Sequence, residues 1–491
     1  MKYYSTRDKS NIVTAAQAIV QGLASDGGLF VPLTIPTVPV SEIEKLLKMD
    51  YRERAVTIMS KYLGEFSETE LRGFVRDAYA DNYDSAEIAP TRFLNDNTAV
   101  LELWHGPTCA FKDMALQMLP RLLTASLKKT GETRKVCILV ATSGDTGKAA
   151  LEGFADVDGT SIVVFYPRDG VSDVQKLQMT TQRGENVFVS AVEGNFDDAQ
   201  TGVKMIFSDR EFAKKLDEKG IFLSSANSIN WGRLLPQIVY YFSAYCDYVN
   251  SGKLKIGDEI DFCVPTGNFG DILAGWYAKK MGLPVRRLIC ASNRNNVLTD
   301  FINTGIYDRN REFFATISPS MDILVSSNLE RLLFMLSDDA SVKGWMDEMK
   351  TLGKYDVGAE ILAKIKADFD GGFASDSEAK AYILEVFKSV NYLMDTHTAD
   401  AYAVLSDLRG AGEAFPTVIV STASPYKFAD SVLDAFGENS SQSGAELISR
   451  LSAVTGTAAS KPLTGLDGRE VRFTGCTSKE AMPDVVMGFL G

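Results

Sequence analysis

The feature that most constrains the fold is a regular alternation of short apolar runs and amphipathic segments between residues 99 and 295. Runs rich in β-branched residues predict strands, and apolar residues three or four positions apart predict helices. Strands are predicted at 136–140, 161–166, 187–192, 260–264 and 287–291, and helices at 148–154, 172–181, 197–207, 231–248 and 271–281. This order is typical of a parallel sheet with helices on both faces, in which ligands bind at the carboxyl ends of the strands.

The region before this alternation follows another pattern. Residues 1–95 indicate a separate N-terminal unit that is mainly helical. Its predicted elements are helices at 12–19, 43–47, 51–62 and 68–79 and a short strand at 29–32. We expect this unit to serve packing rather than catalysis.

The region after the alternation is mostly helical. Residues 300–410 predict an insertion with helices at 328–336, 341–349, 360–368 and 377–391 and a glycine-containing break at 368–372. A further buried strand is expected at 415–421 and a polar loop at 437–444. We therefore expect a catalytic α/β region over 96–435, with about 112–225 as a smaller mobile subdomain, and a tail over 436–491 packed on it.

Composition restricts the class of function. The 491 residues are 45% hydrophobic and 23% charged, as in ordinary globular proteins of two or three domains. The net charge of -13 argues against nucleic acid or an anionic membrane as the main partner. No apolar run has membrane-spanning length and no N-terminal signal is visible, so a cytoplasmic location is expected. Six scattered cysteines and two histidines argue against a disulfide framework, a metal site or a Ser-His-Asp triad.

A candidate nucleophile lies in the stretch 105–113, His-Gly-Pro-Thr-Cys-Ala-Phe-Lys-Asp. The stretch contains a Gly-Pro turn at 106–107 and follows an apolar run, and an apolar helical pattern begins after it. Lys112 lies among apolar residues, which favour the neutral amine and make it available to form a Schiff base. Taken alone, an ordinary surface lysine is the more common case. Lys148 and Lys427 are rivals, but we expect Lys148 to face solvent, and Lys427 comes shortly after a proline.

The first predicted strand is followed by Ser143-Gly144-Asp145-Thr146-Gly147. Small hydroxyl residues and glycines let backbone N–H groups turn toward an anion at a helix N-terminus. A nucleotide P-loop would need Gly at position 142 and Ser or Thr at 149, where this chain has Thr142 and Ala149. A carboxylate-binding loop and an ordinary turn capped by Asp145 both remain open.

Two further polar clusters follow strands. Two glycines in Gly267-Asn268-Phe269-Gly270-Asp271 would let the backbone approach a phosphate, although a simple strand-to-helix turn also explains them. Asn227, Ser228 and Arg233 fit either an N-cap cluster or a fork for a phosphate or carboxylate. Together, one lysine, two glycine loops and this cluster fit a pyridoxal-phosphate site that holds a doubly anionic amino acid.

The order and spacing of six motifs closely resemble the threonine synthase family, in its longer form with an N-terminal domain. The motifs are Tyr4-Ser5-Thr6-Arg7 with 26–32; His105-Gly106-Pro107-Thr108 with Phe111-Lys112-Asp113; 143–147; 227–230 with Arg233; 267–271; and Ser421-Thr422-Ala423. The resemblance implies a fold-type-II pyridoxal-phosphate enzyme, similar to the tryptophan synthase β subunit, with two parallel-sheet α/β domains and a mainly helical N-terminal domain. It also implies conversion of O-phospho-L-homoserine and water to L-threonine and phosphate, the last step of threonine biosynthesis in the aspartate family pathway.

The resemblance implies roles for individual residues. Lys112 would carry the cofactor as a Schiff base and move protons on the substrate. The other implied positions are Gly267, Asn268, Phe269 and Gly270 for the cofactor phosphate, Asp271 as a further cofactor-binding residue, Thr422 for the pyridine nitrogen, Asp145 for the cofactor edge, Ser143 and Thr146 for the substrate carboxylate, and Asn227, Ser228 and Arg233 for the substrate phosphate.

The chain departs from the family pattern at two positions. Many relatives have Asn where this chain has Asp145, and an aspartate donates a hydrogen bond only when it is protonated. Relatives commonly have His where this chain has Ser424. Thr396-His397-Thr398 resembles a family segment near the active site, and an ordinary histidine of the core or the surface is an equally good interpretation.

Two other functions stay open: another lyase of the same fold, such as a phospholyase or a threonine dehydratase, and a catalytically inactive binding homologue. The failed P-loop spacing disfavours a nucleotide-binding kinase. The expected partner is the small-molecule substrate, with no nucleic acid, membrane or metal. We expect the chain to be a monomer or a weak homodimer.

Overall fold

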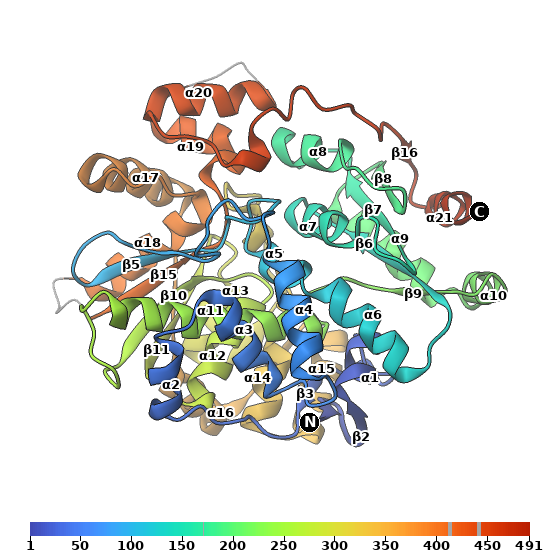
Figure 1. Ribbon diagram of the computed structural model, residues 1–491, viewed down its shortest axis with the longest axis horizontal. Helices are drawn as coiled ribbons and strands as arrows, with labels where there is room; N and C mark the ends of the chain where they lie inside the picture. Colours follow the sequence, from blue (N-terminus) through green and yellow to red (C-terminus); the bar gives the residue numbers. More distant parts are fainter. Residues whose placement is uncertain (170, 411–414, 439–442) are drawn as a thin grey trace.

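The computed structural model describes residues 1–169, 171–410, 415–438 and 443–491, and it contains two large sheets, one in each half of the molecule (Figure 1). The larger sheet has six strands in the order β14-β11-β10-β15-β5-β4. These are β14 (Phe369–Phe373), β11 (Val285–Ser292), β10 (Ile260–Pro265), β15 (Thr417–Ser421), β5 (Thr98–Glu102) and β4 (Thr91–Phe93). All neighbours are parallel except β4 and β5.

The smaller sheet has five parallel strands in the order β16-β8-β7-β6-β9. These are β16 (Cys476–Thr477), β8 (Val187–Val192), β7 (Thr160–Pro167), β6 (Lys135–Ala141) and β9 (Ile221–Ser224). The five strands predicted from the alternation are confirmed as β6, β7, β8, β10 and β11. The predicted α/β class is therefore confirmed.

Both faces of the larger sheet are covered by helices. On one face, apolar side chains from four strands pack in a cluster with α18 (Thr396–Arg409), for example Val100, Cys263, Ile289 and Ile419. Their neighbours in sequence belong to the main core together with α11 (Trp231–Asn250) and α12 (Gly270–Met281). A parallel strand buried on both faces needs a continuous apolar run, and this explains why these strands were predictable.

The smaller sheet is covered in the same way. One face packs on α9 (Phe196–Ser208), α10 (Arg210–Glu218) and the C-terminal helix α21 (Met482–Leu490). The other face joins the main core with α6 (Leu119–Thr130) and α7 (Asp145–Phe154). Helix α8 (Asp173–Thr180) follows β7 in the chain, as predicted.

The N-terminal unit differs from its prediction at the first helix. The predicted helix at 12–19 is wrong at its start, because β2 (Asp8–Thr14) continues to Thr14 and α1 (Ala15–Gln21) begins after it. The β-branched run Ile12-Val13-Thr14 favours a strand, and Thr14 caps α1 in a capping box with Gln17. Strands β1 (Lys2–Ser5), β2 and β3 (Phe30–Pro32) form an antiparallel sheet. The other helices of the unit are confirmed as α2 (Val40–Leu46), α3 (Tyr51–Ser60) and α4 (Glu68–Ala78).

The insertion is helical as predicted, with one error. The glycine-containing break at 368–372 is strand β14, which pairs in parallel with β11 at the edge of the larger sheet. The helices are α13 (Val297–Thr304), α14 (Leu329–Leu336), α15 (Asp339–Leu352), α16 (Gly358–Asp368) and α17 (Asp376–Val390), and β12 (Ile306–Asp308) pairs with β13 (Lys354–Asp356). An edge strand with two glycines lacks the apolar run that identifies a central strand.

The C-terminal tail connects the two halves of the molecule (Figure 1). It leaves α19 (Ala429–Ala435) and α20 (Ala445–Thr455), adds β16 to the edge of the smaller sheet and ends with α21 against α9. Residues 439–442 of the polar loop predicted at 437–444 lie outside the described residues. None of the helices in the described ranges combines the length and apolar character that a membrane span needs.

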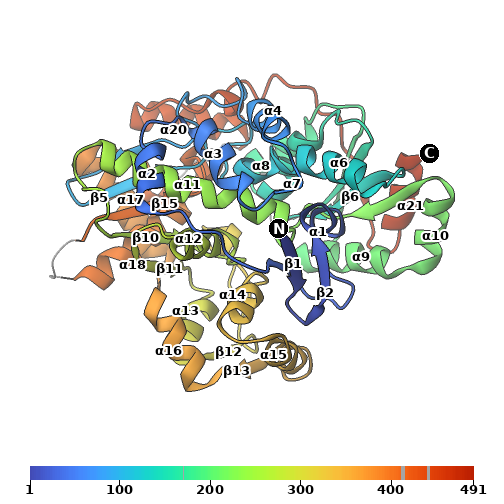
Figure 2. The same ribbon diagram turned by 60° about the horizontal axis from the view of Figure 1, so that its bottom comes forward.

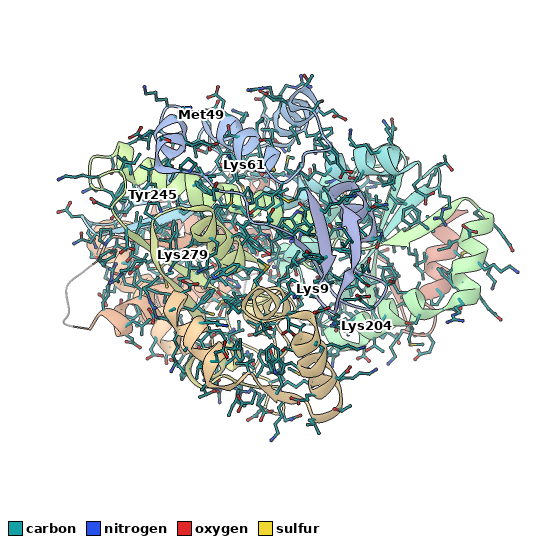
Figure 3. The ribbon with its side chains drawn as sticks, turned by 90° about the horizontal axis from the view of Figure 1, so that it is seen from below. Lys9, Met49, Lys61, Lys204, Tyr245 and Lys279 are labelled. Atoms are coloured by element: carbon teal, nitrogen blue, oxygen red, sulfur yellow. The ribbon has the colours of Figure 1, made fainter. Side chains whose placement is uncertain are left out.

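The buried carboxylate of Glu330 binds the N-terminal unit to the insertion. Glu330 of α14 accepts hydrogen bonds from the Thr6 hydroxyl at 2.5 Å and from Arg7 at 2.9 and 2.7 Å. Figure 2 shows the β1–β2 hairpin beside α14 and α15. Lys9, labelled in Figure 3, extends from this hairpin and lies 5.3 Å from the centre of the Phe334 ring on α14. The motif at residues 4–7 is therefore explained by docking of the N-terminal strands.

Arg7→Met tests this contact. The substitution leaves Glu330 buried without its cation, and we expect a loss of about 2–3 kcal/mol, somewhat less than the ~3–5 kcal/mol typical of a fully buried pair. The thermal unfolding midpoint should therefore fall by several degrees. Arg72→Met, which removes an exposed pair with Glu68, is the matched control and should change the midpoint little. Equal effects of the two substitutions would contradict the proposed contact.

Candidate active site

The first turn of the site joins β6 to α7 and is organised by Thr142. The Thr142 hydroxyl accepts hydrogen bonds from the N–H groups of Gly144 at 3.0 Å and Gly147 at 2.9 Å. Gly144 has a φ of +141°, and a Cβ at this position would lie 2.5 Å from the Gln175 side chain. Thr142 thus occupies one N–H group in the first turn of α7, while Gly144, directly before the helix, has no side chain to cap it. Among the described residues, no side chain bonds the N–H groups of Asp145 and Thr146, which are therefore available to an anion.

The second turn joins β10 to α12. A Cβ on Gly267 would lie 2.6 Å from the carbonyl oxygen of Ser320, so only glycine fits there. Phe269 has a φ of +60° directly before the helix. Within the part of the chain that the structure describes, no side chain caps α12 either. This turn therefore has the open backbone that binds phosphate at helix N-termini.

Lys112 lies between the two turns. It begins α5 (Lys112–Leu116), and its side chain is 11% exposed. Its Nζ is 3.4 Å from the Asp145 carboxylate, at the start of α7, and 3.4 Å from the hydroxyl of Ser320, which packs on Gly267. Burial lowers the pKa of Lys112, and the charges of Lys427 and Arg233 lower it further, whereas Asp145 raises it. A buried amine with a lowered pKa is suited to act as a nucleophile.

The end of β15 lies against the segment before Lys112. The N–H of Phe111 donates to the Thr422 carbonyl at 2.8 Å, and the N–H of Ser424 donates to the Cys109 carbonyl at 3.0 Å. Ala110 and Ala423 form a β-bridge between these bonds. Three strand ends, those of β6, β10 and β15, thus meet at Lys112.

The two rival lysines are both buried. Lys148 was expected to face solvent, and this expectation is wrong: its Nζ lies 2.7 Å from Glu152 and contacts Gln182. Lys427 is fully buried, and its Nζ lies 2.6 Å from Asp145. Burial opposes ionisation of Asp145, but Lys427 and Lys112 hold the pKa of this carboxyl well below its usual range. Asp145 is therefore ionised and accepts hydrogen bonds only.

Arg233 is a buried cation without a buried anion. It lies in the first turn of α11, is 3% exposed, and donates from Nη1 to the Ala226 carbonyl at 2.9 Å. Among the described residues, its Nε has no hydrogen-bond partner and no carboxylate pairs with it. Burial lowers its pKa to about 10. An unpaired buried guanidinium is costly unless a ligand anion completes it.

Asn328 and Arg331 of the insertion connect the loops, and sequence analysis missed both. The Asn328 amide donates to the Asn268 carbonyl at 3.0 Å and to the Ser228 hydroxyl at 3.4 Å. Arg331 donates to the Asn328 side chain and to the Ile229 carbonyl. Asn268, Ser228 and Ile229 lie 60 or more residues away from Asn328 and Arg331 along the chain. No local sequence pattern could therefore have indicated these contacts.

His397 and Ser320 form a second support. The His397 ring is buried, with Nδ1 2.7 Å from Asp395, and Nε2 accepts the N–H of Ser320 at 3.2 Å. Ser320 in turn contacts Lys112, so the histidine is both buried and adjacent to the site. Both interpretations left open for His397 therefore apply.

The other predicted site residues lie on the same turns, and their roles stay predictions. Ser143 and Thr146 are half-buried on the β6–α7 turn, Asn268 is exposed on the β10–α12 turn, and Asn227 and Ser228 precede α11. Asp271 accepts hydrogen bonds from the hydroxyls of Tyr240 at 2.6 Å and Tyr241 at 2.8 Å. This carboxylate thus holds α12 against α11.

Comparison with known proteins agrees with this geometry. Three family models match the chain: the threonine synthase N terminus over residues 2–79, the pyridoxal-phosphate dependent enzymes over 98–424, and the threonine synthase C-terminal region over 398–485. A threonine synthase from Pseudomonas aeruginosa is 42% identical over 88% of this chain and 90% of its own length. The crystal structure of a pyridoxal-phosphate-bound threonine synthase from Brucella melitensis superposes with a TM-score of 0.89 at 37% identity, covering 100% of this chain and 99% of that one.

Some relatives are longer than this chain. The human protein threonine synthase-like 1 is 42% identical over 86% of this chain, but the match spans only 58% of the human protein.

His105, in the central motif, has two carboxylate partners. Its ring nitrogens lie 2.6 Å from Asp84 and 2.9 Å from Glu102, and its ring stacks on Trp104. Burial alone would lower the pKa of His105, but the two carboxylates raise it to about 9. The imidazolium is therefore a structural cation at neutral pH.

We expect NMR titration of the two histidines to give a pKa of about 9 for His105. Because this folded-state pKa lies above the ordinary value of 6.5, the stabilisation is fully present below pH 6.5 and is lost as the pH rises through about 9. His105→Gln should remove this loss of stability, measured as the unfolding midpoint across the same pH range. A His105 pKa near 6.5 would contradict the pairing.

Proposed function

Because this chain belongs to the threonine synthase family of pyridoxal-phosphate-dependent enzymes, we propose that it converts O-phospho-L-homoserine and water to L-threonine and phosphate. The observation that carries the proposal is the guanidinium of Arg233, which has no carboxylate partner among the described residues and lies near the buried amine of Lys112. An enzyme for this substrate must bind a cofactor phosphate and, separately, a substrate phosphate. The chain offers an open anion site for each.

The residues present fit pyridoxal phosphate. Gly267 packs so closely on Ser320 that no side chain fits at this position. The turn before the N-terminus of α12 therefore presents backbone groups, which suit the cofactor phosphate. Gly267, Asn268, Phe269 and Gly270 would hold that phosphate, and the Lys112 amine would hold the aldehyde carbon. When bound, the cofactor supplies an electron sink for negative charge that develops on the substrate.

Three further residues would complete the cofactor pocket. The Thr422 hydroxyl would face the pyridine nitrogen, and a hydroxyl does not force that nitrogen to be protonated. Asp145 would lie at the cofactor edge as a fixed negative charge rather than as a hydrogen-bond donor, since its pKa is held low by Lys427 and Lys112 against the effect of burial. Asp271 would act indirectly, by fixing the start of α12 on α11.

Lys112 would move the protons of the reaction. Its lowered pKa suits a base that takes the proton from Cα of the substrate and then one from Cβ. Arg233, with Asn227 and Ser228, would hold the phosphate group while its bond to Cγ breaks. Water would then add at Cβ, and the two protons would return to carbon. Ser143 and Thr146 would hold the substrate carboxylate at the open start of α7.

We extend the proposal to the cellular setting. The reaction would be the last step of threonine biosynthesis in the aspartate family pathway, carried out in the cytoplasm by a monomer or weak homodimer. Five of the six cysteines are buried free thiols, as is usual for proteins of reducing compartments.

The direct test is to incubate the purified protein with O-phospho-L-homoserine and measure both products. We expect threonine and phosphate in equal amounts, and Lys112→Ala should lower the rate by ~10²–10⁴-fold or more, because it removes the proton carrier. Lys214→Ala, at an exposed position, is the control. Formation of 2-oxobutanoate from threonine would instead identify a dehydratase. Absence of any product from wild-type protein loaded with pyridoxal phosphate would identify an inactive homologue.

Arg233→Met tests the substrate phosphate site. The loss of a charged hydrogen-bond donor, worth ~1.5–3 kcal/mol, should raise KM for O-phospho-L-homoserine by about 10- to 100-fold. Inorganic phosphate should inhibit the wild type and inhibit the variant much more weakly. Because Arg233 has no carboxylate partner among the described residues, the ligand-free variant should unfold at the same or a higher temperature. A large fall in stability with unchanged phosphate inhibition would assign Arg233 a purely structural role.

A further inference from the structure

Asp145 contacts two lysines, one at each oxygen of its carboxylate. One carboxylate oxygen is 2.6 Å from Nζ of Lys427 and accepts the Gln175 amide at 2.8 Å. The other oxygen is 3.4 Å from Nζ of Lys112. The contact to Lys427 is thus shorter and shares its oxygen with a third donor. Nζ of Lys427 also donates to the Thr108 carbonyl at 2.8 Å.

The same contacts make Lys427 unsuited to the role of nucleophile. Its side chain is 0% exposed, against 11% for Lys112, and its Nζ is already bound to two acceptors, the Asp145 carboxylate and the Thr108 carbonyl. Lys427 lies in the 3₁₀ turn η2 (Pro425–Phe428) that follows β15. This turn holds the Lys427 ammonium against Asp145. It directly follows residues 422–424, which pair with residues 109–111.

We propose that Lys427 is a positioning residue that occupies the Asp145 carboxylate, so that Lys112 is left as the free amine of the site. Without Lys427, Asp145 would have only Lys112 as a cationic partner. The two would form a close ion pair, and the proton would be held on Lys112. With Lys427 in place, Asp145 and Lys427 form an ion pair that is neutral overall. The ammonium of Lys427 then repels a positive charge on Lys112.

The other charges around Lys112 act in fixed directions. Burial lowers the pKa of Lys112, and the charge of Arg233 on α11 lowers it further. The charge of Lys112 in turn lowers the pKa of the Asp271 carboxyl on α12, and the charge of Lys427 lowers the pKa values of Asp113 and Cys109. Among the residues that the structure describes, Asp145 is the carboxylate that pairs with Lys112, and Lys427 is the other cation that pairs with Asp145.

The test reads the Lys112 amine without turnover. Full-length protein is freed of cofactor and acetylated with trace acetic anhydride over a range of pH, and labelling of Lys112 is measured by mass spectrometry. In the wild type, half-maximal labelling should occur at a lower pH than for the exposed Lys214. Lys427→Met should raise the midpoint for Lys112 by about one pH unit or more. The reason is that the Asp145 carboxylate loses its Lys427 partner and then favours the protonated form of Lys112.

Asp145→Asn should move the midpoint the opposite way, because it leaves Lys427 without its anion next to Lys112. The double variant Lys427→Met with Asp145→Asn should return toward the wild type. Lys148→Met is the matched control, since it also removes a buried lysine from a carboxylate, Glu152, and should leave the Lys112 midpoint unchanged. Circular dichroism confirms that each variant is folded.

Two results would overturn the proposal: an unchanged midpoint in folded Lys427→Met, or, if that variant does not fold, an Asp145→Asn midpoint that is unchanged or raised. The inference concerns the same site as the proposed function and rests on Lys112 being its amine. The two can fail separately, because labelling needs neither substrate nor cofactor. A shifted midpoint in a protein that makes no threonine would keep the inference and reject the function.

Discussion

The structure depends on an excess of buried positive charge around one carboxylate. Lys112, Lys427 and Arg233 are all largely buried, and Asp145 is the only carboxylate paired with any of them among the described residues. Buried cations without partners destabilise a folded chain by several kcal/mol each, of the order ~3–5 kcal/mol when a partner is missing. Ligand anions can supply the missing charge. The site is therefore built to be completed by phosphate and carboxylate groups rather than to stand empty.

The N-terminal unit and the insertion both contribute to that site from outside. Arg331 donates to the Phe30 carbonyl of the N-terminal sheet at 2.9 Å, to the Ile229 carbonyl before α11 and to Asn328, which holds the β10–α12 turn. One side chain thus connects the packing unit to both proposed phosphate loops. The neighbouring Glu330 binds Thr6 and Arg7. Two neighbouring residues of α14 therefore hold both the N-terminal strands and the two loops in place.

Sequence patterns predicted the central strands and the loops because both depend on local chemistry. A strand buried on two faces needs an apolar run, and a backbone anion site needs glycine at fixed offsets. The β14 strand escaped prediction because an edge strand with two glycines carries no such run. In the β1–β2 hairpin, the run Ile12-Val13-Thr14 was assigned to the helix that begins directly after it. The pairing of Asp145 with Lys427 could not be predicted either, because Lys427 lies almost the whole catalytic region away in sequence. The burial of Lys148 against Glu152 was missed as well, since Lys148 was wrongly expected at the surface. Charge pairing in a core is set by the fold, not by spacing.

The Asp145–Lys427 contact also spans the boundary between the two halves. Asp145 begins α7 of the smaller sheet, whereas Lys427 follows β15 of the larger sheet, and Lys112 lies on the chain between β5 and β6. This ion pair joins elements of the two sheets directly at 2.6 Å, so separation of the sheets would lengthen it. Asp145 would then be left to Lys112, and the amine would take up a proton. If Lys427 has the proposed role, the reactivity of Lys112 would depend on this contact between the two sheets.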